Sequence, residues 1–77
     1  MFHIMVAEDD TNTRKLMCTV LKQNSYEPVP AVDGIDALDI LDRQHVDLIL
    51  LDVMMPRMDG YEFVKTLREG GCNTPVL

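Results

Sequence analysis

The sequence predicts an α/β protein built on a parallel β-sheet. Short apolar segments alternate with segments whose apolar residues recur at helical spacing, in the order β-α-β-α-β-α-β. The apolar segments 4–7 and 48–51 contain no alternating polar residues, which is typical of strands buried on both faces. The chain has 77 residues, enough for one small domain. We therefore expect a single domain with helices on both faces of its sheet.

The first strand is expected over residues 4–7 and the first helix over 11–25. Asp10 or Thr11 can begin this helix, because side-chain oxygens of these residue types accept hydrogen bonds from free backbone N–H groups. The helix has an apolar stripe at helical spacing, made of Leu16, Met17, Val20 and Leu21.

The second strand is expected over residues 26–32. It contains two prolines, which have no N–H to donate, so it is predicted to lie at an edge of the sheet. Asp33 is a good capping residue for a helix over 33–45. One face of that helix carries Ile35, Leu38 and Leu41.

The third strand is expected over 46–52, and the third helix follows Asp59. Glu62, three residues after Asp59, completes a capping-box pattern. Gly70 and Gly71 are expected to end this helix. The last four residues, "TPVL" at 74–77, read as the first residues of a fourth strand.

Composition and charge exclude several classes of function. A net charge of −6 argues against direct binding of nucleic acid or of an anionic membrane, and suits a cation or a basic partner, although simple solubility also explains most surface acids. The cysteines Cys18 and Cys72 are far apart, which disfavours a zinc site or a disulfide framework. No segment reads as a membrane span or a signal peptide, so a cytoplasmic location is expected.

Acidic residues follow two of the predicted strands. Glu8 and Asp9 end the first strand, and Asp52 ends the third. If these strands are neighbours, three carboxylates meet at the carboxyl edge of the sheet, where two unit charges about 4 Å apart repel by roughly 4 kcal/mol at an effective dielectric near 20. An oxygen-only ligand set suits Mg²⁺, which needs one or two carboxylates. Asp52 at a strand tip is then a natural nucleophile for an aspartyl phosphate.

Each acid also has a simpler interpretation. Acids after a strand are often helix caps, and for Glu8 and Asp9 alone capping is the better explanation. Asp52 alone is as readily a solvated turn residue. The combination of acids that each end an apolar strand favours a site. Phosphate-binding, dinucleotide, serine-hydrolase, zinc-protease and calcium-loop motifs do not match the sequence.

Four stretches together resemble a known family. "IMVAEDD", "AVDGIDAL", "DLILLDVMMPRMDGYEF" and "TPVL" are similar, in order and spacing, to the receiver domain of two-component response regulators, which has the CheY-like, flavodoxin-like doubly wound fold. The resemblance covers essentially the whole chain, and the third stretch is the most specific.

The resemblance implies a role for each site residue. Asp52 matches the phosphoacceptor, which receives a phosphoryl group from a sensor histidine kinase or a small phosphodonor. Glu8 and Asp9 match the acidic pair that holds Mg²⁺, and Met54 matches the residue whose backbone carbonyl completes the protein ligands. The chain is then a signalling domain that accepts phosphate on its own aspartate, and not an enzyme acting on a separate substrate.

The chain departs from the family pattern after residue 77. The family continues with the rest of the fourth strand, a helix, a fifth strand and a final helix, and with a Thr or Ser and a Lys that contact the phosphoryl group. Residues 1–77 are thus expected to form an incomplete receiver domain with compromised phosphoryl transfer, which self-associates or swaps elements through an exposed edge strand. A receiver-like scaffold that is not phosphorylated is the main alternative. A Mg²⁺-dependent phosphohydrolase is disfavoured because Met54 stands where its second acid is expected.

Overall fold

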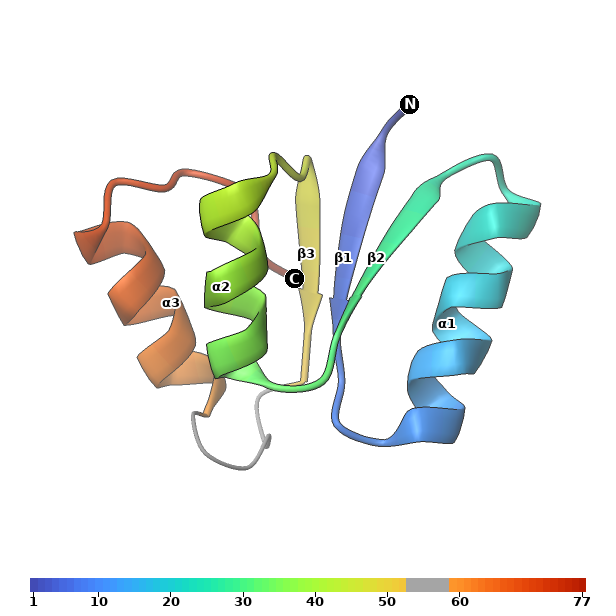
Figure 1. Ribbon diagram of the computed structural model, residues 1–77, viewed down its shortest axis with the longest axis horizontal. Coiled ribbons are helices and arrows are strands. Elements are labelled where there is room, and N and C mark those ends of the chain that lie inside the picture. The colour runs from blue at the N-terminus through green and yellow to red at the C-terminus, as the bar shows by residue number, and fades with distance from the viewer. Residues whose placement is uncertain (53–58) are drawn as a thin grey trace.

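A computed structural model describes residues 1–52 and 59–77. Three parallel strands form the sheet in the order β2-β1-β3 (Figure 1). They are β1 (His3–Ala7), β2 (Glu27–Ala31) and β3 (Leu48–Leu51). Ala7 pairs with Ala31 on one side and with Leu51 on the other, so the three strands end at the same edge. The predicted parallel sheet is confirmed, with β1 at its centre and the proline-containing β2 at an edge.

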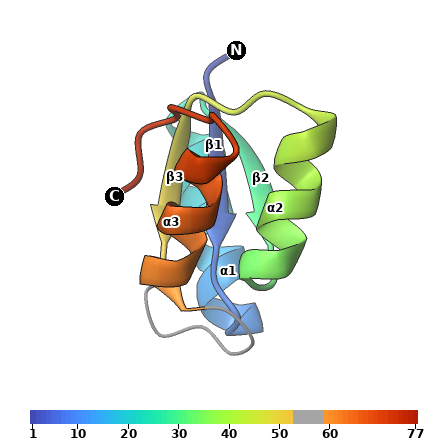
Figure 2. The same cartoon turned by 90° about the vertical axis from the view of Figure 1, so that its left-hand side faces the viewer.

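The helices α1 (Thr11–Gln23), α2 (Gly34–Arg43) and α3 (Gly60–Glu69) cover both faces of the sheet. Figure 1 shows α1 on one side and α2 and α3 on the other, and Figure 2 shows α2 and α3 side by side in front of the strands. This arrangement confirms the doubly wound fold. The main core lies under α2 and α3 and comprises Met5, Ala7, Val29, Ala31, Ala37, Val46, Ile49, Phe63 and Leu67.

Helix α1 begins at a cap and ends at a strained residue. The Asp10 carboxylate accepts from the Thr13 N–H at 2.8 Å, so Asp10 is the cap. Beyond the helix, Ser25 has φ 67, and its N–H donates to the Lys22 carbonyl at 3.1 Å. This left-handed residue closes the helix in a Schellman turn, a position that usually takes glycine.

The apolar stripe of α1 is only partly covered. Because α1 packs on β1 and β2, Met17 and Leu21 are half-buried, whereas 65% of Leu16 and 47% of Val20 are exposed. The same distinction appears on α2, where Leu38 and Leu41 pack against the core but Ile35 is exposed. Helical spacing identifies the apolar residues of a helix, but the neighbouring elements decide which of them are buried.

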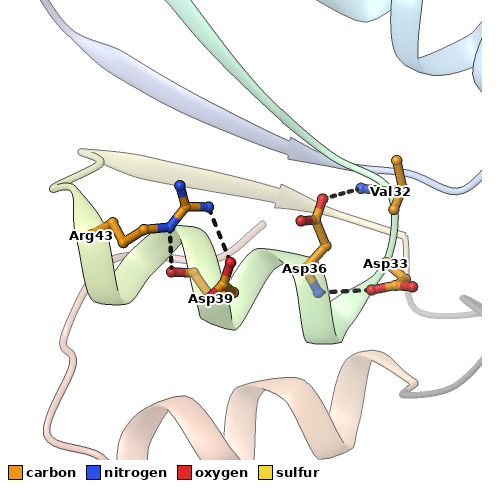
Figure 3. Close-up of polar contacts among 5 residues, drawn as sticks. All are labelled: Val32, Asp33, Asp36, Asp39 and Arg43. Atoms are coloured by element: carbon orange, nitrogen blue, oxygen red, sulfur yellow. Dashed lines mark hydrogen bonds and ion pairs between the residues drawn. The ribbon is translucent and has the colours of Figure 1, made fainter.

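Polar contacts secure the first turn of α2. Figure 3 shows the buried Asp33 carboxylate accepting from the Asp36 N–H at 2.8 Å. The Asp36 carboxylate accepts in turn from the Val32 N–H at 3.0 Å. Further along the helix, Arg43 forms an exposed ion pair with Asp39 at 3.1 Å. The two aspartates near the start of α2 together fix where the chain leaves β2, as the predicted cap at Asp33 requires.

Helix α3 begins and ends as predicted. The Asp59 carboxylate accepts from the Glu62 N–H at 2.9 Å, and the helix ends at Gly70, followed by Gly71 with φ 87. The predicted fourth strand is present as a single parallel bridge between Ile49 and Val76. No helix in the described ranges is both long enough and apolar enough to cross a membrane.

Candidate metal and phosphoacceptor site

The candidate site is built by the ends of β1 and β3. The Asp52 N–H donates to the Ala7 carbonyl at 3.1 Å, which continues the ladder between these strands for one residue past β3. On the other side of β1, the Glu8 N–H donates to the Ala31 carbonyl at 3.1 Å. Because β1 is buried and β3 is hydrogen-bonded beside it, Glu8 and Asp52 are held side by side at the carboxyl edge of the sheet.

Three carboxylates converge at this edge. One oxygen of each of Glu8, Asp9 and Asp52 lies within 4.8 Å of the other two. We call these three residues the acidic cluster. Glu8 and Asp52 are half-buried and Asp9 is exposed, so the cluster lies at the ends of paired strands and remains open to solvent. The three acids that the sequence singles out are thus brought together.

The donor set fits a hard divalent cation. Mg²⁺ binds oxygen ligands at about 2.1 Å, so two ligands on opposite sides of the ion lie about 4.2 Å apart. Oxygens spread over no more than 4.8 Å come within this range by movements of well under an ångström. The described residues that could hold such an ion are therefore Glu8, Asp9 and Asp52. Met54, the fourth predicted ligand, lies outside the described residues.

Electrostatics in the acidic cluster are unfavourable without a cation. A hydrogen bond with the Asp52 side chain, partial burial and the charges of Asp52 and Asp9 raise the pKa of Glu8 from 4.5 to about 7. A carboxyl group holds its proton to this degree because a second negative charge beside the first is costly. A bound cation would remove that cost.

An open hollow adjoins the acidic cluster. It has a volume of about 310 Å³ and is lined by Ala7, Glu8, Met17, Leu50, Leu51, Asp52 and Leu77. Its lining is largely apolar apart from the two acids, so Asp52 stands at the boundary between a polar edge and an apolar surface. This position leaves the half-buried Asp52 side chain partly accessible to solvent.

One contact near the cluster is not predicted by any sequence pattern. The Arg14 guanidinium donates through Nη1 to the Glu8 carbonyl at 2.8 Å and to the Asp9 carbonyl at 3.3 Å. In the sequence, Arg14 is simply a cation off the apolar stripe of a helix. Arg14 lies six residues after Glu8 in the sequence, and the two residues come into contact because α1 turns back over the end of β1.

Comparison with known proteins gives a consistent result. A family profile described as response regulator receiver domain matches residues 4–77. The chain is 39% identical over 74 residues to the sensor histidine kinase RcsC of Escherichia coli (strain K12), covering 96% of this chain and 8% of that protein. It is 40% identical over 74 residues to the response regulator MprA of Mycobacterium sp. (strain KMS), covering 96% of this chain and 32% of that protein.

A solved structure agrees with these relatives. The response regulator TrrA of Thermotoga maritima, determined in complex with Mg²⁺-BeF, superposes with a TM-score of 0.85 at 33% identity, over 91% of this chain and 61% of that one. The chain therefore spans less than two thirds of each of these three proteins.

Proposed function

Because this chain belongs to the response regulator receiver domain family, a phosphoacceptor family of two-component signalling, we propose that Asp52 is its phosphoacceptor and that the acidic cluster binds Mg²⁺. One observation carries the proposal: the carboxylates of Glu8, Asp9 and Asp52 approach within 4.8 Å at the ends of two paired strands. The Mg²⁺-BeF complex of TrrA supports the choice of ion.

In this proposal an Asp52 carboxylate oxygen attacks the phosphorus of a phosphohistidine on a sensor histidine kinase. The P–N bond breaks as the new P–O bond forms, and the leaving imidazole keeps the electron pair and takes a proton from solvent. When bound, Mg²⁺ supplies positive charge that offsets the charge of the transferred phosphoryl group. Glu8 and Asp9 hold the ion, together with Asp52 and the Met54 carbonyl, while β3 fixes the position of Asp52.

The test is the intact mass of this chain after incubation with acetyl phosphate and Mg²⁺. We expect the native sequence to gain one phosphoryl group that is stable in acid and released by hydroxylamine. Asp52→Asn should gain none. Asp42→Asn, which changes an exposed acid on α2, serves as the matched control and should gain the same group as the native chain. A folded native chain that is not modified would favour the receiver-like scaffold instead.

We also propose that residues 1–77 act as one receiver-domain unit that pairs with a second copy through one edge of its sheet. The Glu27 N–H donates to the Phe2 carbonyl, so the alternate residues Pro28 and Pro30 face outward and offer no N–H. At the opposite edge, Ile49 bonds to Pro75 and Leu77, which directs the backbone groups of Val76 away from β3. An edge with free backbone groups is a template for another strand.

Sedimentation at micromolar concentration tests this partner. The native chain is expected to form dimers or larger species, and Val76→Pro is expected to weaken them because it removes the outward N–H of residue 76. Glu27→Gln, a change at the other edge of the sheet, is the control. A single monomeric species for the native chain would contradict pairing through this edge.

A further inference from the structure

We propose that Arg14 is a positioning residue for the acidic cluster, because it holds the turn that carries Glu8 and Asp9 in the shape that brings their carboxylates to Asp52. The inference rests on the proposed function, since it gives Arg14 a task in cation binding. The hydrogen bonds of the Arg14 guanidinium go to the backbone carbonyls of Glu8 and Asp9 and not to their carboxylates. Arg14 therefore acts on their backbone.

The Arg14 guanidinium contacts the backbone of Glu8 and Asp9, two of the three residues of the acidic cluster. Its Nη1 atom donates to the Glu8 carbonyl at 2.8 Å and to the Asp9 carbonyl at 3.3 Å. Its own backbone N–H donates to the Asp10 carbonyl at 2.9 Å, which is a first-turn hydrogen bond of α1. One residue therefore binds three successive carbonyl groups and ties the turn to the start of the helix.

The other hydrogen bonds of the turn fall on different groups, and one of them, the Asp10 carboxylate accepting from the Thr13 N–H at 2.8 Å, also ties the turn to α1. The Glu8 N–H is held by Ala31, at the end of β2. The Asp9 N–H donates to the Glu8 carboxylate at 3.1 Å, a bond within the cluster itself. A cation that binds Glu8 would compete with the bond from the Asp9 N–H. The contacts from Arg14 do not involve the carboxylates, so they persist when the ligands rearrange around an ion.

The positive charge of Arg14 and its contacts with the turn predict opposite effects on Mg²⁺ binding. A cation near the amino end of a helix is unfavourable for the helix dipole, although the Asp10 carboxylate at the N-cap attracts it. A cation close to a Mg²⁺ site also weakens Mg²⁺ binding by simple repulsion. If Arg14 were only a nearby charge, its removal would strengthen binding. If Arg14 positions the turn, its removal weakens binding.

The experiment measures the Mg²⁺ dissociation constant by calorimetry for the native chain, Arg14→Met and Lys15→Met. Both variants remove one positive charge from adjacent positions of α1, but Lys15 is exposed and its side chain forms no hydrogen bond or ion pair with residues 8–10. We expect Arg14→Met to bind Mg²⁺ about 10-fold more weakly, the lower end of the effect of residues that support metal ligands. Lys15→Met is expected to bind as tightly as the native chain or slightly more tightly.

A second readout needs no metal. Amide hydrogen exchange in the absence of Mg²⁺ should rise at Asp9 and Asp10 in Arg14→Met, with the exchange of β3 unchanged. Circular dichroism establishes that each variant is folded. Should Arg14→Met not fold, Arg14→Gln replaces it under the same criteria, since its side chain is too short to reach both carbonyls.

The outcomes separate this inference from the proposed function. Binding by Arg14→Met that is equal to or tighter than that of Lys15→Met overturns the positioning role and leaves the Mg²⁺ site intact. A native chain that binds no Mg²⁺, and behaves like Asp52→Asn, overturns both. Weaker binding by Arg14→Met together with faster exchange at the turn supports both.

Discussion

Replacing Asp52 with asparagine is expected to stabilise the metal-free protein, although it removes the proposed phosphoacceptor. The Asp52 and Glu8 carboxylates approach within 4.8 Å. Two unit charges at that distance repel by about 3 kcal/mol at an effective dielectric near 20, and by about 1 kcal/mol in bulk water. Both residues are half-buried, so the gain in unfolding free energy should lie between these values.

The gain in unfolding free energy from Asp52→Asn depends on pH, and the raised pKa of Glu8 sets the direction of this dependence. That pKa is raised from 4.5 to about 7, first by the hydrogen bond with Asp52. The folded state therefore holds a proton that the unfolded state releases. The resulting stabilisation is complete below pH 4.5 and is lost as the pH rises through 7. Asp52→Asn removes the neighbouring charge, so its advantage over the native chain should be small at low pH and largest above pH 7.

Urea unfolding of both chains in a metal chelator, above and below this range, measures the effect. A gain of about 1 kcal/mol corresponds to a rise in melting temperature of roughly 4–8 °C for a domain of this size. Adding Mg²⁺ should raise the stability of the native chain and close the gap. The control Asp42→Asn should change little at any pH. If Asp52→Asn is less stable than the native chain above pH 7 without metal, the argument from carboxylate repulsion is refuted.

Three further changes test the fold. Ser25→Gly relieves a φ of 67 and is expected to raise the unfolding free energy by about 0.5–1 kcal/mol. The control Gln44→Gly, at φ −151, should lower it. Chemical unfolding measures both variants, and a destabilised Ser25→Gly would contradict the left-handed cap. Phe63→Ala empties a fully buried position and should destabilise the protein by about 3–5 kcal/mol, so that circular dichroism shows a largely unfolded chain. The control Tyr61→Ala, at an 81% exposed position, should change the stability little. A folded Phe63→Ala would refute the assignment of the core. Asp33→Ala removes the buried cap of α2 and should cost about 1 kcal/mol in thermal melts, and an unchanged melting temperature would show that the cap is dispensable.

Much of the fold could be predicted because its signals are local. The unbroken apolar run at 48–51 indicates a strand, although only Ile49 in it is buried and the expected cover on both faces is incomplete. The paired prolines of 26–32 indicate an edge. Asp10, Asp33 and Asp59 each cap a helix as their positions before an amphipathic segment suggest. These features depend on backbone geometry within a few residues, so the sequence contains the information needed to recognise them.

Other features could not be predicted because they depend on which elements become neighbours. The exposure of Leu16 and Val20 follows from α1 packing over β1 and β2, and not from the helical stripe itself. Ser25 shows no glycine-like signal in the sequence, yet it adopts a left-handed conformation because the chain must turn sharply from α1 into β2. The long-range bond from the His3 N–H to the Asp47 carboxylate, at 2.7 Å, likewise joins residues 44 positions apart.

The sequence by itself determined the chemistry that the site can support: three oxygen ligands and no soft ones, each placed where an apolar strand stops. The tertiary structure decided how close those ligands come. The pairing of β3 beside β1 places Asp52 next to Glu8, and the contact of Arg14 with the Glu8 and Asp9 carbonyls lies in the turn from β1 into α1. Charges interact through space and not along the chain, so the raised pKa of Glu8 and the proposed affinity of the acidic cluster for a cation arise only once the strands are paired.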